Sequence, residues 1–289
     1  MTTPVRPDRP LHESHPRDFE KNRYVYPVLS RRAEGISIGV NLNLDRLCNF
    51  DCVYCQVDRR EPAASEPVDL ERLAGELNEM LEFVVSGKIF EHPRFADVPE
   101  PLRRLNDIAL SGDGEPTASP MFEQAVEICA AARSRLELND IKIVLITNAS
   151  LLDRPAVQRA LDVLDANGGE IWAKLDAGTE SHYREVNRSA VPWRRILDNL
   201  LEAARRRPIV VQSLWMRMRG CPPPEAEIEA FCDRLVDITS AGGRIKLVQT
   251  HTVARRPAEQ WVASLSADEL EGIAKTIRRR TGLTVKAFA

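Results

Sequence analysis

Six short apolar runs, each followed by an amphipathic stretch, constrain the fold of this chain more than any other feature. Alternating apolar positions are typical of strands, whereas apolar residues three to four positions apart are typical of helices. The apolar runs predict strands at 36–44, 107–112, 141–147, 170–176, 209–216 and 244–251. The segments after them predict helices at 68–89, 120–136, 155–167, 192–207, 225–241 and 266–280.

This order of elements predicts an α/β fold with a parallel sheet and right-handed crossovers. Six units are too few for a closed barrel of the usual kind. We therefore expect a partial (β/α)6 TIM-like barrel with parallel strands, although a doubly wound sheet fits the same order. The expected organisation is a flexible N-terminal arm at 1–25, a barrel core at 26–258, and a helix with a short strand at 259–289 that packs on the core.

Size and charge limit the classes of function. With 289 residues and a formal net charge of -3, the chain has no global basic field that would draw it onto nucleic acid, so RNA contact would need a local patch. Its polar, proline-rich beginning lacks an apolar targeting segment, and no run of about 18 apolar residues predicts a membrane span. We expect a cytoplasmic protein that does not contact membranes.

Most of the unusual polar residues follow the predicted strands directly. In chain order, these stretches are DRLCNFDCVYC, SGDGEPT, TNAS, KLDAG, RMRGCPPP and THTVARRP. Parallel α/β folds assemble their active sites from loops at the carboxyl ends of the strands. The sequence therefore predicts a single site built from these loops.

The first of these loops holds Cys48, Cys52 and Cys55 in a C-x3-C-x2-C spacing. A structural zinc site usually needs four ligands, often from two C-x2-C pairs, and one such pair is present here. Three thiolates on an iron–sulfur cluster would leave one iron open, which is typical of a reactive site. An iron–sulfur cluster, a zinc ion and metal-free thiols all fit the spacing. Cys129 and Cys232 lie on predicted helices, and we expect them in the core.

Together, the cysteine spacing and the glycine-rich loop resemble the radical S-adenosylmethionine (SAM) superfamily. Cys48, Cys52 and Cys55, with Tyr54 before the last cysteine, resemble its cysteine signature. SGDGEPT resembles its glycine–glycine–glutamate motif, with an aspartate in place of the first glycine. The segments YPVLSRRAEGISIGVNLN, ITNAS, WAKLDAG and VQTHTVARRPAE look like the branch related to wyosine tRNA synthetases. The resemblance covers most of residues 24–289.

The resemblance implies a radical SAM enzyme. Cys48, Cys52 and Cys55 would each bind one iron of a [4Fe–4S] cluster, and SAM would bind the fourth iron. Reductive cleavage of SAM would give a 5′-deoxyadenosyl radical that abstracts hydrogen from a substrate. An external electron donor such as a flavodoxin or a ferredoxin is also implied. Candidate substrates are a tRNA base, a peptide and a small metabolite; a non-catalytic iron–sulfur or zinc-binding protein is the alternative.

The resemblance also implies a set of cofactor-binding residues at the strand ends. These residues are Tyr54, Gly114, Glu115, Asn148, Lys174, Asp176 and Thr250. The Gly114–Glu115 segment would hold the SAM ammonium, because glycine permits close backbone approach and the glutamate is negative. Tyr54 would lie near the adenine. The simpler interpretations are an ordinary turn for SGDGEPT and a core aromatic for Tyr54.

The remaining cofactor residues lie at the ends of three later strands. Asn148 and Asp176 would bind ribose or substrate, or else act as a turn residue and a helix cap. Lys174 shares a strand face with Asp176, so it would point into the barrel and pair with the SAM carboxylate, with substrate or with Asp176. Thr250, together with Val248, would line the adenine pocket.

A few other polar residues have no assigned role. Arg217 and Arg219 share a strand face, which suits either an anion site or solvent exposure. Cys221 is expected to be a loop thiol, and His251 a core or surface histidine. The sequence leaves the catalytic residues unassigned.

Overall fold

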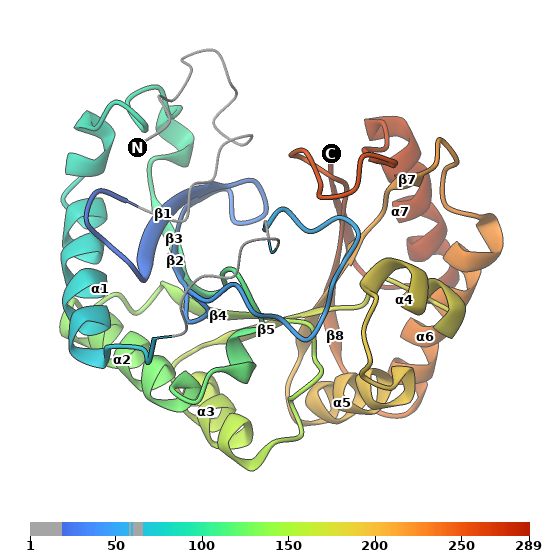
Figure 1. The fold of residues 1–289 in the computed structure, drawn as a ribbon, viewed down its shortest axis with the longest axis horizontal. Coiled ribbons are helices and arrows are strands. Elements are labelled where there is room, and N and C mark those ends of the chain that lie inside the picture. The colour runs from blue at the N-terminus through green and yellow to red at the C-terminus, as the bar shows by residue number, and fades with distance from the viewer. Residues whose placement is uncertain (1–18, 58, 60–65) are drawn as a thin grey trace.

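A curled, mostly parallel sheet of eight strands forms the centre of the molecule (Figure 1). This computed structural model describes residues 19–57, 59 and 66–289. The strands of the sheet are β1 (Val25–Ser30), β2 (Gly35–Val40), β3 (Leu105–Leu110), β4 (Lys142–Thr147), β5 (Glu170–Lys174), β6 (Ile209–Leu214), β8 (Ile245–His251) and β10 (Val285–Phe288). A separate antiparallel ribbon joins β7 (Arg217–Met218) to β9 (Val262–Ala263).

The order of the strands distinguishes the two expected folds. From one edge of the sheet to the other it is β1-β2-β3-β4-β5-β6-β8-β10, and every pair from β2 onward is parallel. A doubly wound sheet would reverse its strand order at a switch point, and this sheet does not. The partial TIM-like barrel is therefore confirmed. All six predicted strands are present, and the predicted short strand near the end of the sequence is β10.

Helices cover the outer face of the curled sheet (Figure 1). They are α1 (Leu70–Val85), α2 (Phe122–Arg135), α3 (Pro155–Ala166), α4 (Glu180–Asn187), α5 (Trp193–Arg206), α6 (Glu225–Ser240) and α7 (Ala267–Thr281), with short 3-10 turns η1 (Lys88–Glu91), η2 (Glu100–Leu102) and η3 (Pro116–Ala118). Ile108 and Leu110 join the main core, which also contains the apolar helix residues. Their neighbour Ala109 alternates to the other face, where it belongs to a smaller cluster with Trp172 inside the barrel.

The antiparallel edge strand β1 was not predicted, because Pro27 interrupts a short apolar run. Proline cannot donate a ladder hydrogen bond, so within sheets it is tolerated mainly on edge strands. In the register of the hairpin, Val25 lies opposite Val40 and Ser30 opposite Gly35. Residues 1–18 of the predicted arm lie outside the described residues, and the described part from Phe19 onward is packed on the core.

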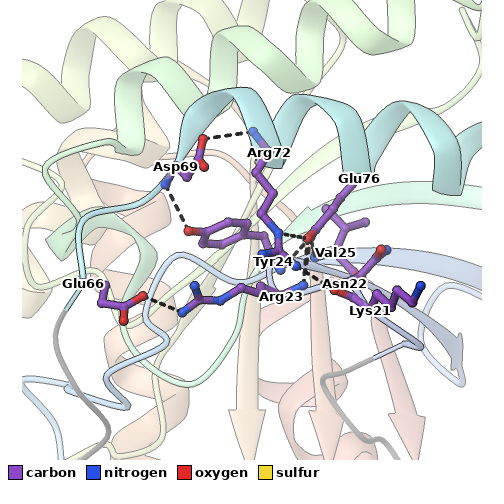
Figure 2. A network of polar contacts seen from close by, with 9 residues as sticks. All are labelled: Lys21, Asn22, Arg23, Tyr24, Val25, Glu66, Asp69, Arg72 and Glu76. Atoms are coloured by element: carbon purple, nitrogen blue, oxygen red, sulfur yellow. Dashed lines mark hydrogen bonds and ion pairs between the residues drawn. The ribbon is translucent and has the colours of Figure 1, made fainter.

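The buried carboxylate of Glu76 on α1 holds the chain just before β1 (Figure 2). It accepts hydrogen bonds from the backbone N–H groups of Arg23 at 2.9 Å, Tyr24 at 2.8 Å and Val25 at 3.3 Å. Arg72, one helical turn earlier, pairs with the same carboxylate at 2.7 Å. Charge-assisted bonds of this kind are stronger than neutral ones, so the start of the hairpin is tied to α1.

Several helix ends follow the expected capping rules. Asp69 caps α1 by accepting the N–H of Arg72 at 3.0 Å. Ser266 and Glu269 form a capping box at the start of α7, and Gly282 ends that helix in the left-handed conformation. The short helix α4 was not predicted, because its eight residues are mostly polar.

The barrel is open between its edge strands, since β1 and β10 do not pair in the described part of the chain. The tip of the β1–β2 hairpin nevertheless reaches β10. Arg31 donates to the carbonyl of Ala289, and Glu34 lies 3.9 Å from the ammonium of Lys286. The hairpin therefore forms part of the wall on the open side. No helix among the described residues is long and apolar enough to cross a bilayer.

Candidate active site

The cysteine loop crosses the mouth of the barrel at the carboxyl ends of the strands (Figure 1). Its backbone is bonded to the last residues of α4: Asp51 N–H donates to the carbonyl of Asn187 at 3.0 Å and Val53 N–H to that of Val186 at 2.9 Å. On the other side, Ala258 N–H donates to the carbonyl of Cys55 at 3.0 Å. These bonds fix the loop from both sides.

Each of the three cysteine sulfurs accepts an N–H hydrogen bond. Cys48 Sγ accepts from the backbone of Phe50 at 3.5 Å. Cys52 Sγ accepts from Asn187 Nδ2 at 3.4 Å, and Cys55 Sγ from Arg59 Nη2 at 3.5 Å. Donors directed at sulfur stabilise thiolate character and tune iron–sulfur centres. The donor set thus fits thiolates that bind a metal cluster.

Lys174 is a second cation beside these thiols, in addition to Arg59. Burial raises the pKa of Cys52 to about 12, and the charge of Lys174 opposes that rise. Burial lowers the pKa of Lys174 itself, but the nearby Cys52 and Asp176 outweigh it, so the net pKa is raised. The ammonium lies 5.5 Å from the centroid of the Tyr54 ring. Lys174 therefore points into the barrel, as predicted, and is charged beside the cysteine loop.

Glu115 is buried, and its carboxylate joins the loops after β3 and β4. One oxygen accepts from the hydroxyls of Thr117 and Thr147, both at 2.6 Å, and the other accepts the N–H of Asn148 at 2.7 Å. Burial raises the pKa of Glu115, whereas these donors lower it. The carboxylate lines the cavity, but it also acts as a clamp between two strand ends.

Gly114 makes the closest contact between the glycine-rich loop and the cysteine loop. A Cβ atom at this position would lie 2.1 Å from the carbonyl oxygen of Leu47. Nearby, Asn41 donates to the Asp113 carboxylate at 2.6 Å and accepts the Asp113 N–H at 3.1 Å. The aspartate in the position of the first glycine thus holds the loops after β2 and β3 together.

Asn148 connects the loop after β4 to the cysteine loop. Its Nδ2 donates to Asn49 Oδ1 at 2.8 Å, and its Oδ1 accepts from the Ser150 hydroxyl at 2.6 Å. Asn49 in turn donates to the Ser150 hydroxyl at 2.7 Å. The side chain lines the cavity, while its polar atoms are already bonded to protein.

Asp176 lies behind Tyr54 and is not part of the cavity wall. It accepts from the Tyr54 hydroxyl, from the N–H of Leu214 at 3.0 Å and from Asn187 at 3.3 Å. Burial, followed by the charge of Asp176, raises the pKa of Tyr54 well above its usual value. Asp176 therefore positions Tyr54, whose ring lines the cavity.

Other residues that the sequence singled out lie elsewhere. Thr250 faces away from the cavity and donates to the carbonyl of Lys286 at 3.3 Å. The two candidate anion-binding arginines are ion-paired, Arg217 with Glu269 and Arg219 with Glu185. The remaining cysteines lie as expected, Cys129 and Cys232 in the core and Cys221 exposed.

One cavity of about 310 Å³ connects these features within the described residues. The three cysteines, Tyr54, Gly114, Glu115, Asn148 and Lys174 all line it. Arg32, Trp172 and His251 also line it and had no predicted role. Arg32 was missed because the β1–β2 hairpin was not predicted. Trp172 was missed because an aromatic residue within a strand does not by itself indicate a site. A volume of this order is usual for small-molecule pockets.

The match to a known protein family covers the same loops. The sequence model of the radical SAM superfamily matches residues 42–235. The chain belongs to the radical SAM superfamily. The matched region begins just before the cysteine loop and ends within α6. Membership predicted from the motifs is confirmed, and this radical SAM protein carries its superfamily signature at the mouth of the barrel.

Relatives and solved structures extend the comparison. UPF0026 protein MJ1312 of Methanocaldococcus jannaschii is 33% identical over 181 residues, which cover 61% of this chain and 46% of that protein. The aligned part is thus less than half of this relative. A radical SAM methyltransferase from Sphaerobacter thermophilus has a TM-score of 0.58 at 14% identity, covering 91% of this chain and 68% of that one, and so shares the fold. A structure of TYW1 with a lysine–pyruvate adduct has a TM-score of 0.49 at 18% identity, covering 86% and 74%.

Proposed function

We propose that this radical SAM protein is an enzyme that binds a [4Fe–4S] cluster through Cys48, Cys52 and Cys55 and uses it with SAM to abstract hydrogen from a substrate in the barrel. The observation that carries the proposal is the convergence of three N–H-bonded thiols at the mouth of a polar cavity. A cluster that has three cysteine ligands leaves one iron for another molecule to bind.

The number of cysteines favours a cluster over one zinc ion, because a structural zinc site usually has four ligands. Zinc draws its ligands to within about 2.3 Å of a single centre. In the part of the chain that the structure describes, no three His, Cys, Asp or Glu side chains are grouped to hold one metal ion. In a cluster each cysteine binds a different iron, so separated thiols are suitable ligands.

The residues around the thiols have separate roles in this proposal. Lys174 balances the negative charge of the thiolates and attracts the SAM carboxylate. Tyr54 packs beside the adenine, and Asp176 positions its ring from behind. Gly114 and Glu115 hold the SAM ammonium, and Asn148 keeps the loop after β4 against the cysteine loop.

A cluster held by Cys48, Cys52 and Cys55 would supply, with SAM, the radical chemistry: one electron would cleave SAM reductively, and its adenosyl fragment would take a hydrogen atom from the substrate. We propose that an external one-electron donor such as a flavodoxin or a ferredoxin reduces the cluster. The chain's own contribution is to orient SAM beneath the cysteine loop and to keep water from the reacting atoms.

Anaerobic reconstitution tests this function. The purified protein is expected to bind about four irons and four sulfides, the composition of one [4Fe–4S] cluster. Reduced with dithionite in the presence of SAM, it is expected to release 5′-deoxyadenosine, measured by liquid chromatography. Cys52→Ala should abolish this product, because one iron loses its ligand. Cys221→Ala is the matched control, since Cys221 is an exposed loop thiol, and it should keep both iron and product.

Two results would contradict the proposal. One is a full complement of iron with no 5′-deoxyadenosine. The other is a single zinc ion without sulfide in protein purified without oxygen, which would favour a zinc-binding protein.

A further inference from the structure

The barrel cavity contains a cation, Arg32, that forms no ion pair with any described residue. Arg32, at the tip of the β1–β2 hairpin, lies with its guanidinium 5.8 Å from the centroid of the Trp172 ring. Among the described residues it makes no hydrogen bond or ion pair, whereas the adjacent Arg31 donates to Ala289. A partly buried guanidinium without an acceptor is costly. Arg32 is therefore available to an anionic ligand.

Asp107 is the acid nearest Arg32 in the cavity, and it does not neutralise this cation. Its carboxylate accepts from the Ser37 hydroxyl and makes no ion pair with Arg32. Burial raises the pKa of Asp107 to about 6, although Ser37 and Arg32 lower it. Arg32 attracts Asp107 electrostatically, but no ion pair joins the two side chains.

His251 provides a second unsatisfied polar group in the same cavity. Its Nδ1 atom is buried, and no described residue bonds to it. Burial lowers the pKa of the imidazole well below its usual value, and the charges of Arg32 and Lys174 lower it further. The ring is thus neutral, with one nitrogen that donates and one that accepts. Buried polar atoms are nearly always bonded, so Nδ1 is available to a polar group of a bound molecule.

The position of Arg32 distinguishes between substrate classes. A nucleotide of an RNA chain that entered the barrel would bring a neutral base inside and leave its phosphates near the mouth. A small organic anion carries its charge on the part that enters the barrel. The cavity wall beside Arg32 and His251 includes Trp172 and Phe288, which suit the apolar part of such a molecule.

Resting on the proposed function, we propose that the substrate is a small organic anion whose carboxylate or phosphate pairs with Arg32. A neighbouring polar group of the substrate bonds to His251 Nδ1, and its carbon skeleton packs on Trp172. Arg32 is thus a substrate-binding residue at the end of the cavity away from the cysteines. A bidentate guanidinium suits either oxyanion, because both present two oxygens in one plane.

The test is thermal unfolding of the anaerobically reconstituted protein in sodium acetate, sodium phosphate or sodium chloride at equal ionic strength. Ligands that bind only the folded state raise the unfolding midpoint in a saturable manner. We expect acetate or phosphate, but not chloride, to do so. Saturation by acetate indicates a carboxylate substrate, and saturation by phosphate indicates a phosphorylated one. Arg32→Gln should weaken the response at least about tenfold in concentration, since a partly buried ion pair is lost.

Arg194→Gln is the matched control, because Arg194 is 84% exposed and pairs only with Asp198 in the described structure. It removes the same charge and should respond as the wild type does. If Arg32→Gln does not fold, Arg32→Lys replaces it; this change keeps the charge but loses the planar fork, and should still weaken the response.

Equal responses to all three salts, or an Arg32 variant that responds as the wild type does, would overturn the inference. Saturable binding of total tRNA in place of the anions would also overturn it and would favour an RNA substrate. Wild-type 5′-deoxyadenosine formation is measured in parallel. If anions bind in an Arg32-dependent manner but no 5′-deoxyadenosine forms, only the proposed function is contradicted. If 5′-deoxyadenosine forms but anions do not bind through Arg32, only this inference is contradicted.

Discussion

Gly114 determines how closely two loops of the site approach each other. Its Cα lies so near the cysteine loop that a Cβ would be 2.1 Å from Leu47 O and 2.7 Å from Asn43 Cβ. The first of these atoms is backbone and cannot move aside as a flexible side chain would. The glycine is therefore required for contact between protein segments, independently of any contact with SAM.

Gly114→Ala is expected to lower the free energy of unfolding by about 2 kcal/mol, because overpacking against backbone forces the loops apart. The amount of iron that the protein binds after reconstitution should also decrease. Urea denaturation and iron analysis measure the two effects. Gly272→Ala on α7, where a Cβ would meet nothing within 4 Å, should instead raise stability by about 0.5–1 kcal/mol. A Gly114→Ala protein with wild-type stability and iron would refute this account.

Residues of the site were predictable where the signal is local. The cysteines, Gly114 and Glu115 lie within short motifs, and Lys174 follows from strand alternation. Contacts between distant segments were not predictable: Asn187 bonds to Cys52 across 135 positions of the chain. Asp176 was expected to bind the cofactor or substrate. Its position two residues after Lys174 on the same strand did not reveal that its carboxylate would accept a hydrogen bond from the Tyr54 hydroxyl.

At the scale of elements, a single side chain joins the first strand to the first helix. Glu76 accepts three consecutive backbone N–H groups, of Arg23, Tyr24 and Val25 (Figure 2). These donors precede or begin β1 and have no sheet partner on that side. The helix therefore completes hydrogen bonding that the edge strand cannot supply.

Glu76→Ala should lower the free energy of unfolding by about 3 kcal/mol or more, because partly buried N–H groups lose a charged acceptor. Glu79→Ala changes the same residue type on the same helix at an exposed position. It should alter stability by no more than about 0.5 kcal/mol. Urea denaturation of both variants gives the comparison, and equal losses would show that the Glu76 contacts contribute little.

Long amphipathic helices and buried parallel strands were predictable because their periodicity extends over many residues. The hairpin strand β1 and the helix α4 were not. Pro27 weakens the strand pattern in β1, and α4 depends on the cap at Thr179, which accepts the N–H of His182 at 3.2 Å. Tertiary contacts add to these local features, since the Thr179 hydroxyl also donates to Glu227 of α6 at 2.7 Å.

For the molecule as a whole, the barrel interior is more polar than the layer between sheet and helices. Asp107, Arg32, Lys174 and His251 all lie on the inner face. The order of the predicted elements limited the fold to a partial barrel or a doubly wound sheet, but the contents of the barrel interior depend on a hairpin that the pattern did not show. The charge state of this interior should influence the stability of the entire fold.

The protonation of Asp107 allows the effect of this interior charge on the free energy of unfolding to be measured. Its folded pKa of about 6 exceeds the ordinary 3.8, so the folded state binds the proton more tightly than the unfolded state. Stability relative to Asp107→Asn should therefore fall as pH rises from about 4 to about 6, by about 3 kcal/mol in total. Denaturation of both proteins across this range gives the difference. Asp140→Asn, at an exposed position, should show no such trend, and a pH-independent difference for Asp107→Asn would refute the prediction.

The edge strand β1 also has a consequence for how copies of this protein behave in concentrated solution. An unpaired sheet edge can template strands from other molecules and so promote aggregation. Proline at Pro27 removes one donor from β1, and the hairpin tip is joined to β10 through Arg31. Pro27, which interrupts the strand pattern in the sequence, thus also makes the β1 edge a poor template for β-pairing between molecules.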